Sequence, residues 1–151
     1  MVSVGLVDDH TVVRQGLRLL LEADPDVTVV GEAADGIEAL KLVQRCKPDV
    51  LVLDLMMPGL DGLEVTRRVS HLKLGTRVIL LTMYGDEAYV RDGIKGGAMG
   101  YVVKESCGTD LFQAIRDVAA GRRYLSPSLA DFQYLWALTP AAVLKSSARV
   151  H

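Results

Sequence analysis

The most constraining feature of the sequence is a set of short apolar runs, each of which ends at a polar, chemically reactive residue. The runs are rich in valine, leucine and isoleucine, and their apolar residues follow one another instead of alternating with polar ones. Short continuous runs of this kind are typical of strands that are buried on both faces. The runs, each with the polar residues that follow it, are 4–7 with Asp8 and Asp9, 50–53 with Asp54, 78–81 with Thr82, and 101–103 with Lys104.

Segments with helical periodicity separate these runs, so the strands are predicted to be parallel and joined by right-handed crossovers. A buried stripe that includes Val13 and Leu17 indicates the first helix, and Ile37 is predicted to face inward from a second helix over 36–46. Asp35 and Asp61 stand where helix caps are expected. We therefore predict an α/β fold: a doubly wound, five-stranded parallel sheet of flavodoxin-like strand order 2-1-3-4-5, with helices on both faces.

Parallel strands all end along one edge of their sheet, which would bring the terminal polar residues together. Asp8 and Asp9 alone could serve an ordinary turn and helix cap, for which one aspartate suffices. The carboxylate of Asp54 converging on the same place would be unfavourable without a cation. Oxygen ligands of this kind favour Mg²⁺, and the lack of a nearby histidine or cysteine cluster argues against zinc. Thr82 and Lys104, each ordinary when taken alone, add a hydroxyl and an ammonium that can bind an oxyanion.

Composition narrows the class of protein further. The 151 residues suffice for one domain with a proper core, and the net charge of −2 argues against a nucleic-acid surface spread over it. No apolar stretch approaches the roughly 20 residues of a membrane span. Cys46 and Cys107 lack the spacing of a metal site, so reduced thiols and a cytoplasmic location are expected.

The motifs at these strand ends resemble those of the receiver domain of bacterial two-component response regulators. The resemblance covers residues 1 to about 122, and a further run resembles the LuxR/NarL-FixJ-type subfamily. The matching segments are Asp8-Asp9, residues 54–62 (DLMMPGLDG), Leu81-Thr82, residues 100–104 (GYVVK) and, for the subfamily, residues 121–127 (GRRYLSP).

The resemblance implies that Asp54 accepts a phosphoryl group from a sensor histidine kinase. It implies that Asp9 and Asp54 bind Mg²⁺ (or Mn²⁺) directly, that Asp8 does so usually through water, and that the backbone carbonyl of Met56 is a further ligand. An aspartate carboxylate is a competent nucleophile towards phosphorus, which supports the same assignment on chemical grounds.

Thr82 and Lys104 would, by the same resemblance, bind the phosphoryl oxygens, and Tyr101 would be the aromatic side chain that turns inward on activation. Such a chain is a phosphoacceptor switch and not an enzyme: its only reactions are Mg²⁺-dependent self-phosphorylation and autodephosphorylation. Many receivers have a proline after the strand-end lysine, often with a cis bond. Glu105 follows Lys104 here, so a trans bond is expected.

The receiver domain is predicted to span residues 1–122, followed by a tail or truncated linker over 123–151. The tail is too short for a complete helix-turn-helix output domain, so DNA would be bound only through an output domain missing from this chain. It could form a short helix within 129–138, with Trp136 exposed. Homodimerisation on phosphorylation is expected, and no membrane contact.

Other functions for such a sheet are less compatible with the residues present. A flavin site would need a phosphate-binding loop rich in Ser and Thr after the first strand, where this chain has Asp8, Asp9 and His10. Phosphatases with an aspartate nucleophile usually carry an acid–base aspartate two residues later, where this chain has Met56. The alternative that stays open is a stand-alone or non-phosphorylated receiver-like module for protein interaction.

Overall fold

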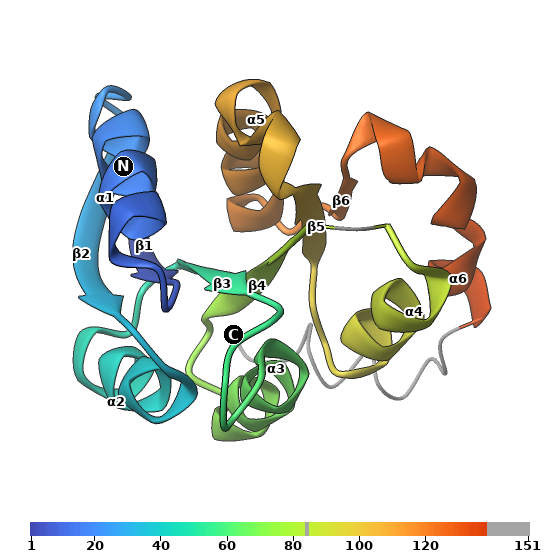
Figure 1. Ribbon diagram of the computed structural model, residues 1–151, viewed down its shortest axis with the longest axis horizontal. Coiled ribbons are helices and arrows are strands. Elements are labelled where there is room, and N and C mark those ends of the chain that lie inside the picture. The colour runs from blue at the N-terminus through green and yellow to red at the C-terminus, as the bar shows by residue number, and fades with distance from the viewer. Residues whose placement is uncertain (84, 139–151) are drawn as a thin grey trace.

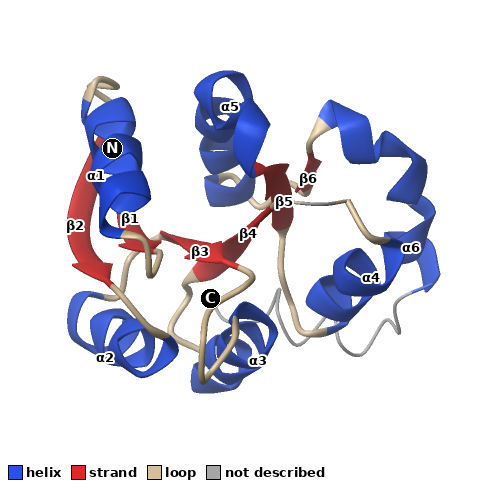
Figure 2. Ribbon diagram, viewed as in Figure 1, coloured by secondary structure: helices blue, strands red, loops and turns tan. Residues whose placement is uncertain are grey.

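The computed structural model describes residues 1–83 and 85–138. A parallel sheet runs through the middle of the molecule in the order β2-β1-β3-β4-β5-β6, with helices on both of its faces (Figures 1 and 2). Within the described residues every helix is too short or too polar to cross a bilayer. The elements are β1 (Val2–Val7), α1 (Thr11–Glu22), β2 (Val27–Ala33), α2 (Gly36–Cys46), β3 (Val50–Asp54), α3 (Gly62–Leu72), β4 (Arg77–Thr82), α4 (Glu87–Lys95), β5 (Gly100–Val103), the 3₁₀ helix η1 (Lys104–Ser106), α5 (Cys107–Ala119), β6 (Tyr124–Leu125), the 3₁₀ helix η2 (Pro127–Phe132) and α6 (Tyr134–Leu138).

Two hydrophobic layers hold the sheet between the helices. One layer joins α1 and α5 to one face, and the other joins α2, α3 and α4 to the opposite face (Figure 1). Successive residues of a strand point to opposite faces, so a strand covered on both sides must be apolar throughout. β3 shows this directly, because Val52 faces the first layer, Leu53 faces the second, and all five residues of the strand are buried. The predicted fully buried strands are confirmed.

Aspartates begin three of the helices, two of them at positions where caps were expected. The side chain of Asp35 accepts a hydrogen bond from the backbone N–H of Glu38, and Asp61 accepts one from Glu64. Each bond satisfies a backbone donor that has no partner inside the helix. Because β3 leads into a loop that ends at Asp61, the cap of α3 fixes the far end of the loop that follows Asp54.

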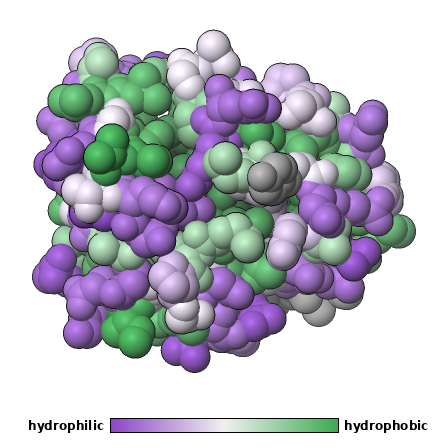
Figure 3. All heavy atoms as spheres, in the orientation of Figure 1, coloured by the Kyte–Doolittle hydropathy of each residue, from purple (hydrophilic) through white to green (hydrophobic). Residues whose placement is uncertain are grey.

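Two side chains that were predicted to face the core are exposed. Val13 is 40% exposed, whereas Leu21 on the same helix is fully buried. Each step of four residues turns the direction of the side chain by about 40° around the helix axis. Val13 lies two such steps before Leu21, so its side chain points away from the buried face. Ile37 is 61% exposed. Its helix turns the small residues Gly36 and Ala39 towards the core instead, which lets α2 approach its neighbours closely. Figure 3 shows hydrophobic and hydrophilic side chains interspersed on one side of the molecule.

A sixth strand, absent from the prediction, extends the sheet beyond β5. The backbone N–H of Tyr124 donates to the carbonyl of Met99, and that of Ser126 donates to the carbonyl of Tyr101. The buried hydroxyl of Ser126 also accepts a hydrogen bond from the Val103 N–H at 3.0 Å. A strand of two residues has too short an apolar pattern to be recognised in the sequence. It forms through its backbone pairing with β5.

The segment after β6 packs against the helix α4 (Figure 1). The side chain of Leu129 lies against Gly85, where an added Cβ atom would come within 2.3 Å of it. The hydroxyl of Tyr134 donates to the carboxylate of Glu87 on α4 at 2.7 Å. Trp136 is only 6% exposed, with the guanidinium of Arg123 over its ring, so the prediction of an exposed Trp136 was wrong. Burial of this residue depends on β6, which turns the chain back over α4.

We predict that Leu129→Ala lowers the free energy of unfolding by about 2–5 kcal/mol, because it opens a cavity in a layer shared with α4. The matched control is Leu138→Ala, which truncates a leucine of the same segment that is 71% exposed and should change stability by less than about 0.5 kcal/mol. Urea unfolding of both variants measures the difference. Equal stabilities would show that residues beyond 122 are a tail and not part of the folded unit.

Candidate functional site

The register of the sheet places the predicted acidic residues side by side. Val7 at the end of β1 pairs with Leu53 on β3, so the next residue of each strand brings Asp8 next to Asp54. Asp8 is fully buried and Asp54 is 2% exposed. Asp9 follows on the loop into α1 and is partly exposed. The acidic group therefore lies at the carboxyl edge of the adjacent strands β1 and β3.

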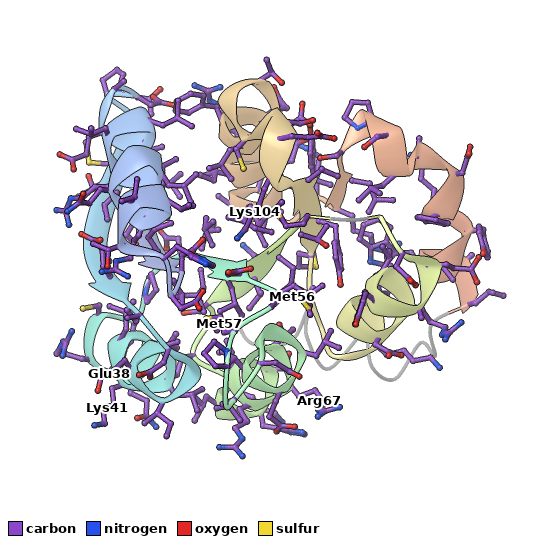
Figure 4. All side chains as sticks on the ribbon, viewed as in Figure 1. Glu38, Lys41, Met56, Met57, Arg67 and Lys104 are labelled. Carbon is purple, nitrogen blue, oxygen red and sulfur yellow. The ribbon has the colours of Figure 1, made fainter. Side chains whose placement is uncertain are left out.

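The same register brings the hydroxyl and the ammonium to this edge. Asp54 pairs with Leu81 on β4, which places Thr82 one residue beyond it. Thr82 in turn pairs with Val103 on β5, and Lys104 comes next. Lys104 extends from β5 towards the ends of β1 and β3 (Figure 4), and Thr82 is buried. All of the predicted strand-end residues thus lie at one edge of the sheet.

Lys104 is the cation of this site. Its Nζ atom lies 3.1 Å from Oδ2 of Asp54 and 3.3 Å from Oδ2 of Asp8, and its side chain is 16% exposed. Burial alone would lower the pKa of the lysine, but the bonds and charges of Asp54 and Asp8 outweigh it and raise that pKa. Lys104 therefore keeps its charge and bridges the two buried carboxylates.

The carboxylates outnumber the cations around them. Burial raises the pKa of Asp54, and the hydrogen bond and charge of Lys104 offset that effect only in part. Ligand atoms of Asp8, Asp9, His10 and Asp54 all lie within 4.8 Å of one another. Crowded carboxylates of this kind carry an electrostatic cost that a bound cation removes.

The donor set fits a hard divalent cation. The atoms Asp8 Oδ2, Asp9 Oδ1 and Asp54 Oδ2 are buried. Apart from the ion pairs of Lys104 with Asp8 and Asp54 and the contact of His10 with Asp9, they make no hydrogen bond among the described residues. Buried oxygens without hydrogen bonds are costly unless a cation binds them, and carboxylate oxygens are the ligands that Mg²⁺ prefers. Nδ1 of His10 lies 3.4 Å from Asp8 and 3.2 Å from Asp9, but its side chain is 66% exposed.

The loop after Asp54 is held close to the carboxylates. The backbone N–H of Met56 donates to Oδ1 of Asp54 at 3.2 Å, and the Met56 side chain is 56% exposed. At the other end of the loop, Gly62 donates to the carbonyl of Leu55. A Cβ atom at Gly62 would lie 2.6 Å from the Asp54 carbonyl, so only glycine allows α3 to start this close to the site.

Tyr101 points inward, beneath α4. Its side chain is fully buried, its hydroxyl donates to the backbone carbonyl of Tyr89, and burial raises the pKa of the phenol. Gly93 on α4 makes this possible, because a Cβ atom there would lie 2.6 Å from the tyrosine ring and hydroxyl. Within the described residues the peptide bonds are trans, including the bond between Lys104 and Glu105, as expected.

Sequence reasoning missed one residue at the site. Arg14 on α1 donates from its guanidinium to the backbone carbonyl of Asp8 at 2.6 Å. The only signal in the sequence is an arginine one helical turn after the loop that carries Asp8 and Asp9, a spacing shared by many surface residues.

Comparisons with known proteins agree with this geometry. The family described as "Response regulator receiver domain" matches residues 4–116. Among curated proteins, the DNA-binding transcriptional activator DevR/DosR of Mycobacterium tuberculosis is 46% identical over 125 residues, 83% of this chain and 58% of that protein. The transcriptional regulatory protein LiaR of Bacillus subtilis is 39% identical over 130 residues, 86% of this chain and 62% of LiaR. The chain thus spans about three fifths of the length of these relatives.

Solved structures lead to the same family. A two-component response regulator of the LuxR family from Aurantimonas sp. SI85-9A1 is 41% identical, with a TM-score of 0.83 over 87% of this chain and 94% of the other. The signal receiver domain of the putative response regulator NarL from Mycobacterium tuberculosis is 40% identical, with a TM-score of 0.77 over 80% of this chain and 98% of the other. The chain belongs to the response regulator receiver family, among receivers of the LuxR/NarL type.

Proposed function

We propose that this receiver accepts a phosphoryl group on the carboxylate of Asp54. The observation that carries the proposal is the position of Asp54: its buried carboxylate lies 3.1 Å from the ammonium of Lys104 and within the same cluster as the acidic pair Asp8 and Asp9. In the reaction, a carboxylate oxygen forms a bond to phosphorus while the bond from phosphorus to the donor breaks, and the leaving group keeps that electron pair. Phosphoryl transfer needs in-line positioning and neutralisation of the phosphoryl oxygens.

Mg²⁺ (or Mn²⁺) is proposed as the cofactor, held by carboxylate oxygens of Asp8, Asp9 and Asp54 and by the backbone carbonyl of Met56. When bound, the ion neutralises charge on the phosphoryl oxygens. Lys104, which follows β5 at the same edge, is proposed to neutralise phosphoryl charge as well, and the hydroxyl of Thr82 is proposed to bind a phosphoryl oxygen. The support for the ion is the set of buried carboxylate oxygens whose polar contacts are limited to Lys104 and His10.

The output of the reaction is proposed to be a change of conformation. Phosphorylation adds roughly 1.5 to 2 negative charges and new acceptor oxygens at Asp54. These oxygens draw Thr82 towards them, and the change reaches Tyr101, which lies on the neighbouring strand beneath α4.

The phosphoryl donor is proposed to be a sensor histidine kinase, with homodimerisation as the response in the cytoplasm. DNA would be bound only by an output domain outside these 151 residues. The family of relatives that includes transcriptional regulators supports this reading.

Asp54→Ala is predicted to abolish phosphorylation by acetyl phosphate, because it removes the carboxylate that is proposed to accept the phosphoryl group. Phos-tag electrophoresis checks this: the wild-type chain should shift in Mg²⁺ and fail to shift in EDTA. The control Asp26→Ala, an exposed aspartate of the turn before β2, should shift like wild type.

Two results of this experiment would contradict the proposal. A wild-type chain that never shifts would support a non-phosphorylated interaction module, and a shift that survives in Asp54→Ala would place the phosphoryl group elsewhere.

A second prediction concerns the stability of the metal-free protein. Because the pKa of Asp54 is raised in the fold by burial, ionising this side chain costs stability. This free-energy cost is absent in acid, below the pKa that Asp54 has in the unfolded chain. It grows as the pH rises from that pKa through the raised pKa of the folded protein, and it is complete above the raised pKa. Asp54→Asn should therefore raise the Tm in EDTA at neutral pH and lose that advantage in acid.

Thermal unfolding of wild type and Asp54→Asn over a range of pH in EDTA measures the difference. An asparagine variant that is less stable than wild type at neutral pH would contradict the electrostatic description of the site.

A further inference from the structure

The loop that carries Asp8 and Asp9 into α1 lacks the usual side-chain anchor. The helices α2, α3 and α4 each begin with an aspartate whose carboxylate accepts a backbone N–H. The corresponding residue of α1 is His10, which makes no side-chain cap. Within the loop, Oδ1 of Asp8 accepts the backbone N–H of His10 at 2.8 Å, and a further anchor reaches the loop from α1.

Arg14 supplies this anchor from within the first turns of α1. Its Nη1 atom donates to the backbone carbonyl of Asp8 at 2.6 Å, and its Nε atom donates to Oε1 of Glu32 at 3.1 Å. Glu32 belongs to β2, the strand beside β1, and its second carboxylate oxygen pairs with Arg18. The Arg14 side chain is only 17% exposed. Since the guanidinium is planar, its two bonds fix one orientation between helix, loop and strand.

The carbonyl that Arg14 holds belongs to the peptide group between Asp8 and Asp9. The N–H of Asp8 donates to the carbonyl of Ala33 on β2 at 3.2 Å, so both sides of Asp8 are tied to that neighbouring strand. With this peptide plane fixed, the direction in which Asp9 leaves the chain is fixed as well. Asp9 has a buried oxygen without a hydrogen bond, within the same 4.8 Å cluster as Asp8 and Asp54.

We propose that Arg14 is a positioning residue for the divalent cation: through the Asp8 carbonyl and Glu32, it holds the Asp8–Asp9 pair in the geometry that binds Mg²⁺. This inference rests on the proposed function, because it assumes that the acidic cluster binds the ion. Groups that orient metal ligands without touching the metal typically contribute 10–100-fold to affinity.

The sign of the effect separates positioning from simple charge. A guanidinium near a cation site repels the cation, so by charge alone the removal of Arg14 would strengthen Mg²⁺ binding. Positioning has the opposite consequence, because the loop that carries the ligands loses its anchor. Arg18 offers a matched control: it lies one turn further along the same helix and pairs with the same Glu32, and no contact with Asp8 is found for it among the described residues.

Isothermal titration of Mg²⁺ into the metal-free chain tests the proposal with Arg14→Met and Arg18→Met. We expect Arg14→Met to bind Mg²⁺ about 10–100-fold more weakly than wild type, and Arg18→Met to bind within about twofold of it. Thermal unfolding measures the stability of each variant separately, because Arg14→Met removes the bond to the Asp8 carbonyl and one ion pair with Glu32, whereas Arg18→Met removes ion pairs with Glu32 and Glu22. An Arg14→Met affinity equal to that of wild type, or tighter, would overturn the inference.

Two further variants keep the outcome unambiguous. Arg14→Lys keeps the positive charge but not the planar guanidinium, so its affinity for Mg²⁺ should lie between those of wild type and Arg14→Met. If the methionine variant fails to fold, the lysine variant takes its place in the test. Asp9→Asn should lose Mg²⁺ binding. If wild type itself binds no Mg²⁺, the proposed function fails together with the inference. If wild type binds Mg²⁺, and Arg14→Lys and Arg14→Met bind it with the affinity of wild type, the inference alone fails.

Discussion

The structure depends on a balance of charge at the carboxyl edge of its sheet. Two buried carboxylates, Asp8 and Asp54, lie next to each other with Asp9 close by, and Lys104 bridges the buried pair. Burial raises the pKa of Asp54, and the bond and charge of the one lysine offset that effect only in part. Because the negative charge of the site exceeds its positive charge, a bound cation would stabilise it. An added phosphoryl group would make the site more negative again. The same imbalance underlies both the proposed affinity for a metal ion and the proposed response to phosphorylation.

The rest of the fold serves to hold these charges in place. Strands that are apolar on both faces lock the register between two helical layers, and the register decides which residues reach the edge. The loops need separate anchors. Asp61 caps α3 at the end of the loop after Asp54, Gly62 allows that helix to start close to the strand, and Arg14 holds the loop that carries Asp8. Next to β5, β6 and the segment after it pack against Tyr101 and α4.

Much of the fold and of the candidate site could be predicted from the sequence, for a physical reason. In a parallel sheet the residue that follows a buried run must lie at the carboxyl edge, so Asp8, Asp54 and Lys104 could be placed without a structure. The failures concern features that local patterns do not encode. The exposure of Ile37 depends on how closely Gly36 and Ala39 let α2 approach its neighbours. The burial of Trp136 depends on β6, which exists only because β5 offers an unpaired edge. Arg14 could not be recognised because its role is a contact with a backbone carbonyl, to which any donor of suitable reach could bind.

The most direct test of the central claim is the unfolding free energy of Lys104→Met, measured by urea denaturation with and without Mg²⁺. If Lys104 is the cation that makes the acidic cluster tolerable, the metal-free variant should lose about 3 kcal/mol, because it leaves buried carboxylates without a partner. Mg²⁺ should then restore more stability to the variant than it adds to wild type. A metal-free Lys104→Met variant as stable as wild type would contradict the account.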